Sequence, residues 1–117
     1  MDKKENVISL LVNNKPDVLA RVAGTLGGKG YNIETLCVDV TINPDVSKII
    51  LTTIGTKATV QKIEAQLARL IDVIKVENLT DVETVKRELV LIRMSLTADN
   101  KNELIRRINQ LNCKILT

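Results

Sequence analysis

The sequence contains no histidine, phenylalanine or tryptophan, and Tyr31 is the only aromatic residue among its 117 positions. Without histidine, the chain can build neither a Ser-His-Asp nor a Cys-His catalytic arrangement, and it lacks the commonest ligand of transition metals. Without a set of aromatic side chains, it lacks the stacking platform on which sheet-type RNA-binding domains hold bases. We therefore expect a chain with no intrinsic catalysis and no metal site.

Positive charge is too weak and too dispersed to mark a nucleic-acid interface. The 17 lysine and arginine residues face 14 aspartate and glutamate residues, for a net charge of +3. The tightest basic groups are Lys86-Arg87 and Arg106-Arg107, which are typical of solvated helix faces. We expect no nucleic-acid partner; a ferredoxin-like nucleic-acid binder is an alternative that only the isoelectric point near 9.0 favours.

Two cysteines, Cys37 and Cys113, form neither a disulfide framework nor a metal-binding motif. Both fall in strand-like patterns, where a free thiol usually fills a small apolar core or sheet position. Cys37 and Lys48 are the remaining candidates for an enzyme, and neither has a histidine to activate it. Residues 1–6 lack the apolar core of a signal peptide and no run has membrane-spanning length, so we expect a cytoplasmic protein with no membrane partner.

Two polar motifs bracket one short helix near the N-terminus. The apolar run Val7–Val12 is typical of a central strand, and Asn14-Lys15-Pro16-Asp17 follows it, with Pro16 expected at the first helical position. The helix stops at Gly27-Gly28-Lys29-Gly30, and Gly30-Tyr31-Asn32-Ile33-Glu34 leads into the next strand. Its buried stripe consists of Val18, Leu19, Val22, Ala23 and Leu26. Because a helix N-terminus carries free N–H groups and partial positive charge, this layout indicates a sensor for the carboxylate of a small acid or amino acid.

The next segments complete the order of strands and helices. Residues Ile33–Ile42 alternate and residues Lys48–Ile54 are rich in β-branched side chains, so the turn Asn43-Pro44-Asp45 joins them as a hairpin. A second amphipathic helix follows, and Val73–Glu77 gives a short fourth strand. The helix is expected to bury Val60, Ile63, Leu67 and Leu70 and to expose Lys57, Gln61, Lys62 and Glu64.

The order strand, helix, strand, strand, helix, strand predicts an α+β fold of the ferredoxin-like βαββαβ class, with a four-stranded antiparallel sheet and both helices on one face. Such a sheet leaves one face uncovered and two edges open, which favours side-by-side pairing with a second copy. Beyond a linker at residues 80–87, residues 88–117 are expected to form a partial strand-helix-strand of a second ferredoxin-like domain. The strands are expected at 88–96 and 113–117 and the helix at 102–111, so either the chain is cut short or a partner covers this part.

Three segments resemble the regulatory small subunit of acetolactate synthase (acetohydroxyacid synthase), an ACT-domain family: Ile8–Val22, Gly30–Glu34 and Gln66–Val73. Residues Arg87–Arg93 match the family's second segment, and the family's order is kept over nearly the whole chain. The resemblance implies an amino-acid-binding, dimerising ACT domain at residues 1–79, followed by the truncated start of the C-terminal ferredoxin-like domain. Chains of this family normally continue well past the point where this sequence ends.

The resemblance also implies what the protein does. It implies a non-catalytic subunit that binds and activates the thiamine-diphosphate-dependent catalytic subunit of acetolactate synthase. It further implies feedback control by valine, or a related branched-chain amino acid, in branched-chain amino-acid biosynthesis. Thiamine diphosphate, Mg²⁺ and FAD would belong to the catalytic subunit, and no cofactor is expected in this chain. A stand-alone ACT-type amino-acid sensor without a catalytic partner is the alternative.

The family's effector site maps onto Asn14, Asp17, Val18, Asn32 and Ile33, with Asn32 reaching the site from a neighbouring subunit. From the residues alone, both asparagines fit cap or turn roles as well as binding roles. Asp17 departs from the family pattern, in which a glycine lets the ligand carboxylate approach the helix closely. Two carboxylates about 4 Å apart repel enough to weaken binding roughly tenfold to a thousandfold. Our hypothesis is that Asp17 weakens or abolishes feedback while it leaves the fold and activation intact.

Overall fold

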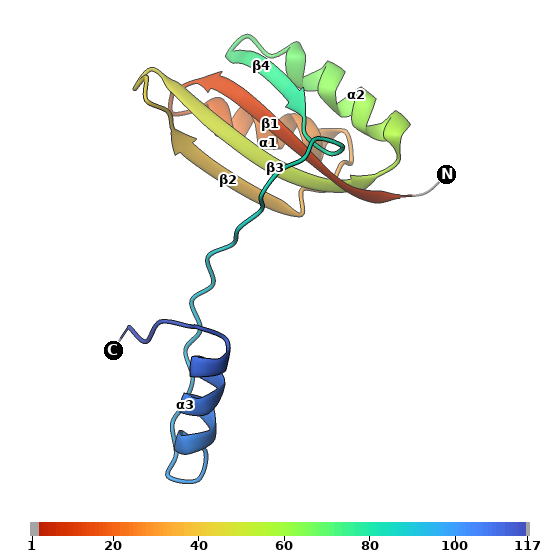
Figure 1. Ribbon diagram of the computed structural model, residues 1–117. Helices are drawn as coiled ribbons and strands as arrows, with labels where there is room; N and C mark the ends of the chain where they lie inside the picture. The colour runs from red at the N-terminus through yellow and green to blue at the C-terminus, as the bar shows by residue number, and fades with distance from the viewer. Residues whose placement is uncertain (1–2, 117) are drawn as a thin grey trace. The chain divides into compact units, whose positions relative to one another are not determined.

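The computed structural model describes residues 3–116, which divide into two compact units between Val85 and Lys86 (Figure 1). The first unit contains β1 (Lys4–Asn13), α1 (Val18–Gly28), β2 (Thr35–Val40), β3 (Val46–Gly55), α2 (Lys57–Ala68) and β4 (Val73–Asn78). The second unit contains α3 (Lys101–Gln110). In the part of the chain that the structure describes, no helix is both long enough and apolar enough to cross a membrane.

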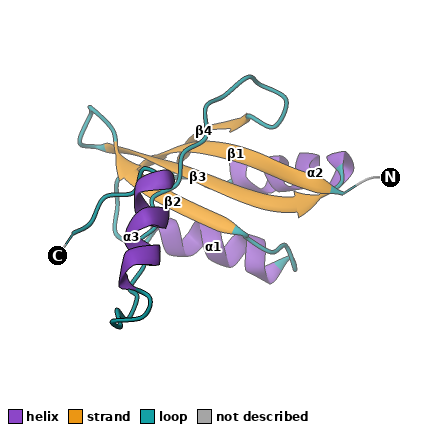
Figure 2. Cartoon of the chain, turned by 60° about the horizontal axis from the view of Figure 1, so that its bottom comes forward, coloured by secondary structure: helices purple, strands orange, loops and turns teal. Residues whose placement is uncertain are grey.

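The first unit is a four-stranded antiparallel sheet with the strand order β2-β3-β1-β4, which confirms the predicted ferredoxin-like βαββαβ fold. The long central strand β1 pairs with β3 from Lys4↔Gly55 to Asn13↔Val46, and it pairs with β4 on its other side. Figure 2 shows α1 and α2 lying along the same face of the sheet. β2 and β4 therefore form the two edges, and β1 carries the loop into α1 from the centre of the sheet.

The core lies between the two helices and the sheet. Alternate residues of β1 and β3 point to the helices, so Ile8 and Leu10 of β1 meet Leu51 and Ile49 of β3 across the ladder. Each helix buries one stripe: Val18, Val22 and Leu26 from α1, and Val60, Ile63 and Leu67 from α2. A fully buried leucine or isoleucine contributes about 1.5–3 kcal/mol to stability, so this aliphatic cluster supports the fold without any aromatic anchor.

The start of α1 differs from the prediction, and its end agrees. The helix begins at Val18 with Asp17 as the N-cap residue, so Pro16 is not the first helical residue. Pro16 lies in a preceding turn, because the Val18 N–H reaches back to the Lys15 carbonyl at 3.3 Å. At the other end the predicted glycine stop is confirmed: the helix ends at Gly28, and Gly30 adopts a φ of +79°, which glycine tolerates best.

Two predicted features of the second helix are also corrected. Glu64, expected on the exposed face, is only partly exposed, and its Oε1 atom is enclosed without a hydrogen-bond partner among the described residues. Leu70 lies beyond the last helical residue, Ala68, but still packs against the core, because the chain turns back toward β4 at this point. The predicted buried stripe of α2 is otherwise confirmed.

The edge strand β2 is shorter than the predicted Ile33–Ile42 and is exposed along its whole length. Its residues Leu36, Val38 and Val40 pair with helix-facing residues of β3, yet they remain 41%, 39% and 57% exposed. Helix α1 therefore leaves this edge of the sheet uncovered. The first unit carries an apolar strip on an open strand, which is the kind of surface that proteins usually cover.

In the second unit α3 confirms the predicted helix, and the two strands expected beside it are absent. Asn100 is the N-cap residue of this helix, and its Oδ1 accepts the N–H of Thr97 at 2.8 Å. Residues 88–96 and 113–116 form no strand, because no other described segment pairs with them and a strand needs a ladder partner; Thr117 lies outside the described residues. That residues 88–117 begin a second ferredoxin-like domain, after an ACT domain at 1–79 and a linker at 80–87, stays a prediction.

Candidate functional site

The loop between β1 and α1 is held at one side by Asn14. The Asn14 backbone N–H donates to the carbonyl of Asp45 at 2.8 Å, and its side-chain Nδ2 donates to the carbonyl of Pro44 at 2.9 Å. Both acceptors belong to the turn between β2 and β3. Asn14 is exposed, and within residues 3–116 its amide oxygen accepts no hydrogen bond. Asn14 therefore has the turn role that the sequence left open, and its amide oxygen could still accept a hydrogen bond from a ligand.

Asp17 stands at the N-terminus of α1 but does not cap it. Its side chain makes no hydrogen bond to the first N–H groups of the helix. Instead it forms an ion pair with Arg21, one turn further on, whose Nε and Nη2 atoms both donate to Asp17 Oδ2. This hydrogen bond from Arg21 is the main reason that the pKa of Asp17 lies below its usual value. The Val18 N–H already donates to the Lys15 carbonyl, so it is the next N–H groups of the first turn, those of Leu19 and Ala20, that keep their capacity to receive an anion.

A buried carboxylate, Asp72, joins this cluster from the loop between α2 and β4. Asp72 is 4% exposed, and its Oδ1 accepts Asn13 Nδ2 at 3.1 Å and Lys15 Nζ at 3.3 Å. Its Oδ2 lies 3.0 Å from Arg21 Nη1, so Arg21 bridges Asp17 and Asp72. The hydrogen bond from Asn13 lowers the pKa of Asp72 most, and the hydrogen bond and charge of Lys15 and the charge of Arg21 lower it further.

The cluster changes the electrostatic argument made from the sequence. Two carboxylates, Asp17 and Asp72, face two cations, Lys15 and Arg21, so their formal charges cancel. A ligand carboxylate at the start of α1 would therefore meet a balanced ion pair rather than the bare negative charge of Asp17. Sequence reasoning missed Asp72; the signal was an aspartate between the apolar residues Ile71 and Val73, but only the sheet order places it beside the loop.

The other predicted site residues lie elsewhere in the same copy. Asn32 and Ile33 follow the far end of α1, and a helix of 11 residues separates them from Asp17 by roughly 16 Å. Asn32 is exposed, its Nδ2 donates to Glu34 Oε1 at 2.9 Å, and its carbonyl accepts the Thr53 hydroxyl at 2.7 Å. Ile33 packs against the core, and Val18 is only 3% exposed. Within one copy the structure brings Asn14 and Asp17 together, and it does not bring Asn32 to them.

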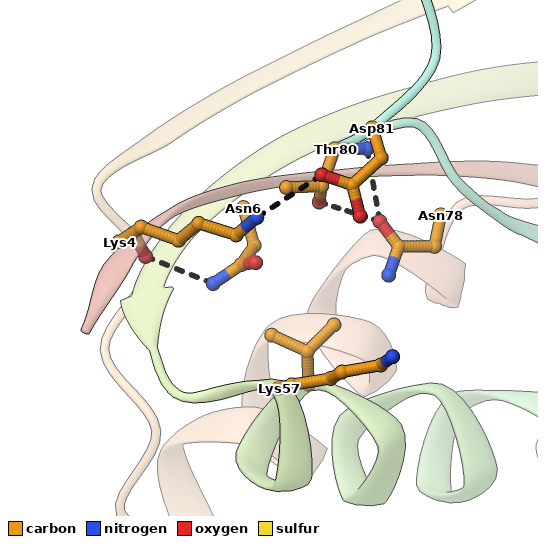
Figure 3. A pocket seen from close by; sticks show the side chains of 7 residues that line it. Lys4, Asn6, Lys57, Asn78, Thr80 and Asp81 are labelled. Carbon is orange, nitrogen blue, oxygen red and sulfur yellow. Dashed lines mark hydrogen bonds and ion pairs between the residues drawn. The ribbon is translucent and has the colours of Figure 1, made fainter. Parts of the chain in front are cut away.

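The described residues also line a small hollow at the opposite end of β1 (Figure 3). Its volume of about 60 Å³ has room for a few water molecules. Lys4 Nζ pairs with Asp81 Oδ1 across it at 3.0 Å, and the Thr80 hydroxyl accepts the Val7 N–H at 3.1 Å. The remaining lining comes from Asn6, Lys57, Val60 and Asn78. None of the predicted site residues lies here, so the hollow is separate from the loop that begins α1.

The two cysteines are free and exposed. Cys37 holds the predicted sheet position, but on the uncovered edge strand β2, where its Sγ lies 3.8 Å from Asp39 Oδ2. Cys113 lies beyond α3, where the expected strand does not form, so it fills no core position. Across residues 3–116 no three acidic or cysteine side chains gather in a way that could hold a metal ion.

Comparisons with known proteins agree on one family. Residues 8–75 match the family described as the AHAS small subunit-like ACT domain. The acetolactate synthase small subunit of Aquifex aeolicus is 38% identical over 108 residues, which are 92% of this chain and 56% of that protein. The acetolactate synthase small subunit of Mycobacterium avium is 35% identical over 116 residues, which are 99% of this chain and 70% of that protein. The chain thus spans little more than half of the Aquifex relative.

Solved structures support the fold. The crystal structure of the acetolactate synthase small subunit from Thermotoga maritima superposes with a TM-score of 0.78 at 24% identity, over 97% of this chain and 71% of that one. The ACT domain of the GTP pyrophosphokinase of Chlorobium tepidum gives a TM-score of 0.62 at 16% identity, over 76% of this chain and 100% of that one. With a matching domain over more than half of its length and relatives above 30% identity, the chain belongs to the family of acetolactate synthase small subunits.

Proposed function

We propose that this chain is a regulatory subunit that binds and activates the catalytic subunit of an acetolactate synthase and makes its activity sensitive to valine or a related branched-chain amino acid. Family membership supports the partner, and the uncapped start of α1 beside Asn14 supports the effector. The chain itself contributes regulation, while thiamine diphosphate, Mg²⁺ and FAD belong to the catalytic subunit. We place the complex in the cytoplasm.

The proposal includes a homodimer that forms edge to edge through β2. Leu36, Val38 and Val40 form an exposed apolar strip on this open strand, and a second copy would cover the strip with its own. The unpaired N–H and C=O groups of an edge strand favour the same pairing. Two antiparallel β2 strands would extend the sheet across the dimer, in the way that isologous interfaces pair one patch with itself.

This pairing would account for the separation of the predicted site residues within one copy. The observation that carries the proposal is that these residues lie beyond opposite ends of the exposed edge strand β2. In an antiparallel pair, the start of one strand lies beside the end of the other. Asn32 lies just before the start of β2, and Asn14 is tied to Pro44 and Asp45 just after the end of β2. Asn32 of a second copy would therefore approach Asn14 and Asp17 of the first. We infer two equivalent effector sites, each completed by the other subunit.

Asp17 is proposed to weaken the response to valine. Its carboxylate stands where a ligand carboxylate would approach the helix N-terminus, so the two negative charges repel each other there. The ion pair with Arg21 offsets part of this repulsion. We therefore place the weakening near the tenfold end of the range that Coulomb's law allows, and we expect activation of the catalytic subunit to be unaffected.

The proposal is tested by measuring acetolactate formation from pyruvate by the cognate catalytic subunit, with and without this chain, over a range of valine concentrations. Activation that valine reverses only at high concentration is the expected result. Activation that valine reverses at low concentration would keep the regulatory function and refute the role of Asp17. Valine binding without activation would instead favour the stand-alone amino-acid sensor.

A further inference from the structure

Asp72 is the only charged side chain that the fold buries within residues 3–116. Burying a carboxylate costs free energy unless hydrogen bonds and opposite charges compensate it. The partners of Asp72 therefore identify the part of the structure that its carboxylate holds in place. All three side-chain partners of Asp72 come from the segment that ends β1 and opens α1: Asn13, Lys15 and Arg21. A backbone bond runs the same way, because the Asn13 N–H donates to the Asp72 carbonyl at 2.8 Å.

The loop that begins α1 is therefore clamped from two sides. On one side Asn14 is tied to the β2–β3 turn through Pro44 and Asp45. On the other side Asp72 holds the residues on both flanks of Asn14 and reaches Arg21 in the first turns of the helix. The two clamps together set where the Asn14 amide and the N-terminus of α1 point.

We propose that Asp72 is a positioning residue for the amino-acid effector: it sets effector affinity by orienting Asn13, Lys15 and Arg21, without contacting the effector itself. The inference rests on the proposed effector function. Arg21 is the main link, because it is shared between Asp72 and Asp17, and its position decides how far the charge of Asp17 is balanced. When the Asp72 charge is absent, Arg21 is held by Asp17 alone and Lys15 loses its carboxylate partner.

The test uses Asp72→Asn, which keeps the shape of the side chain and removes its charge. Valine affinity of the full chain bound to the catalytic subunit is measured by calorimetry at 1 M salt, where charge effects beyond about 3 Å are screened. We expect Asp72→Asn to weaken valine binding about tenfold, while maximal activation of the catalytic subunit is unchanged. In an Arg21→Met background the same substitution should have a smaller effect, about threefold, because Asp72 then acts only through Asn13 and Lys15.

Asp81→Asn is the matched control. Asp81 also pairs with a lysine, Lys4, but at the opposite end of β1, and this variant loses the same unit of charge. It should leave valine affinity unchanged. If Asp72→Asn does not fold, Lys15→Gln removes one of the partners from the exposed side and should shift valine affinity in the same direction, by about threefold.

The outcomes separate this inference from the function on which it rests. If the wild-type chain binds valine and Asp72→Asn binds it equally well, the positioning role is refuted and the regulatory function stands. The Asp17→Gly variant provides a tighter-binding background for the same comparison. If neither the wild-type chain nor Asp17→Gly binds valine, leucine or isoleucine, the effector site itself is refuted, and the role of Asp72 falls with it.

Discussion

Arg21 donates to the carboxylate of Asp17 one helical turn before it, at the point where α1 begins. This ion pair places a positive charge beside the negative charge that departs from the family pattern. Arg21 therefore balances the negative charge of Asp17 within the chain, and the start of α1 is electrostatically close to neutral rather than negative. The consequence for valine can be measured by changing Asp17 alone.

Asp17→Gly should strengthen inhibition by valine about tenfold, because the competing carboxylate is removed and the backbone can approach the ligand more closely. Arg21 would then be available to Asp72 and to the ligand carboxylate. The measurement is the valine concentration that halves acetolactate formation by the complex. Asp17→Asn removes the charge and keeps the bulk, so it should give a smaller gain in sensitivity. Equal sensitivity in all three proteins would contradict the role of Asp17.

Val38→Asp should prevent the proposed dimer from forming. Val38 lies in the middle of the exposed edge strand β2, where two copies of the new carboxylate would meet across the pair. We expect the dimer dissociation constant to rise by about a hundredfold or more, and the valine response to disappear with the dimer. Sedimentation velocity measures the first effect and the activity assay the second.

Ile54→Asp is the matched control for this surface. Ile54 is also a half-exposed apolar residue of the sheet, but it lies on β3 and not on the edge strand. It should leave the dimer intact. A dimer that survives Val38→Asp and dissociates with Ile54→Asp would show that the uncovered face, rather than the β2 edge, is the interface.

The first unit could be predicted from the sequence because each of its elements has a strong local signal. Val7–Val12 is apolar except for Ser9, and the glycine stop ends α1 where expected. The stripes of both helices recur at helical spacing, although Leu19, predicted in the buried stripe of α1, is exposed. The second unit shows the limit of such signals. Residues 88–96 have the composition of a strand, but a strand also requires a partner, and nothing in the local sequence states whether that partner is present.

The candidate site could be predicted only in part, for a geometric reason. The motif at Asn14 and Asp17 is contiguous, so the sequence shows it directly. The buried carboxylate of Asp72 is far away in the sequence and reaches the motif only because β4 pairs beside β1. The ion pair between Asp17 and Arg21 has the usual spacing for one helical turn, yet the sequence does not say that Arg21 also reaches Asp72.

Leu67→Ala should destabilise the first unit by about 2–5 kcal/mol, because Leu67 is fully buried and its truncation leaves a cavity between α2 and the sheet. The measurement is the urea midpoint of unfolding followed by circular dichroism. Leu111→Ala is the control, since Leu111 is 75% exposed and its truncation should change the free energy of unfolding by less than about 0.5 kcal/mol. Equal effects of the two substitutions would contradict the assignment of the core.

Acid should destabilise the protein through Asp72 and Asp17. The pKa of each carboxyl is lower in the folded chain than the usual 3.8, because Asn13, Lys15 and Arg21 favour the ionised form. The stability that these groups contribute is therefore fully present above about pH 4, and it is lost as the pH falls through their folded pKa values. Melting temperatures measured from pH 7 to pH 2 should fall steeply only below about pH 4, and the fall should be shallower in Asp72→Asn, which has no proton to gain. An equally steep fall in that variant would show that other carboxylates, such as Glu77 beside Lys75, cause the acid sensitivity.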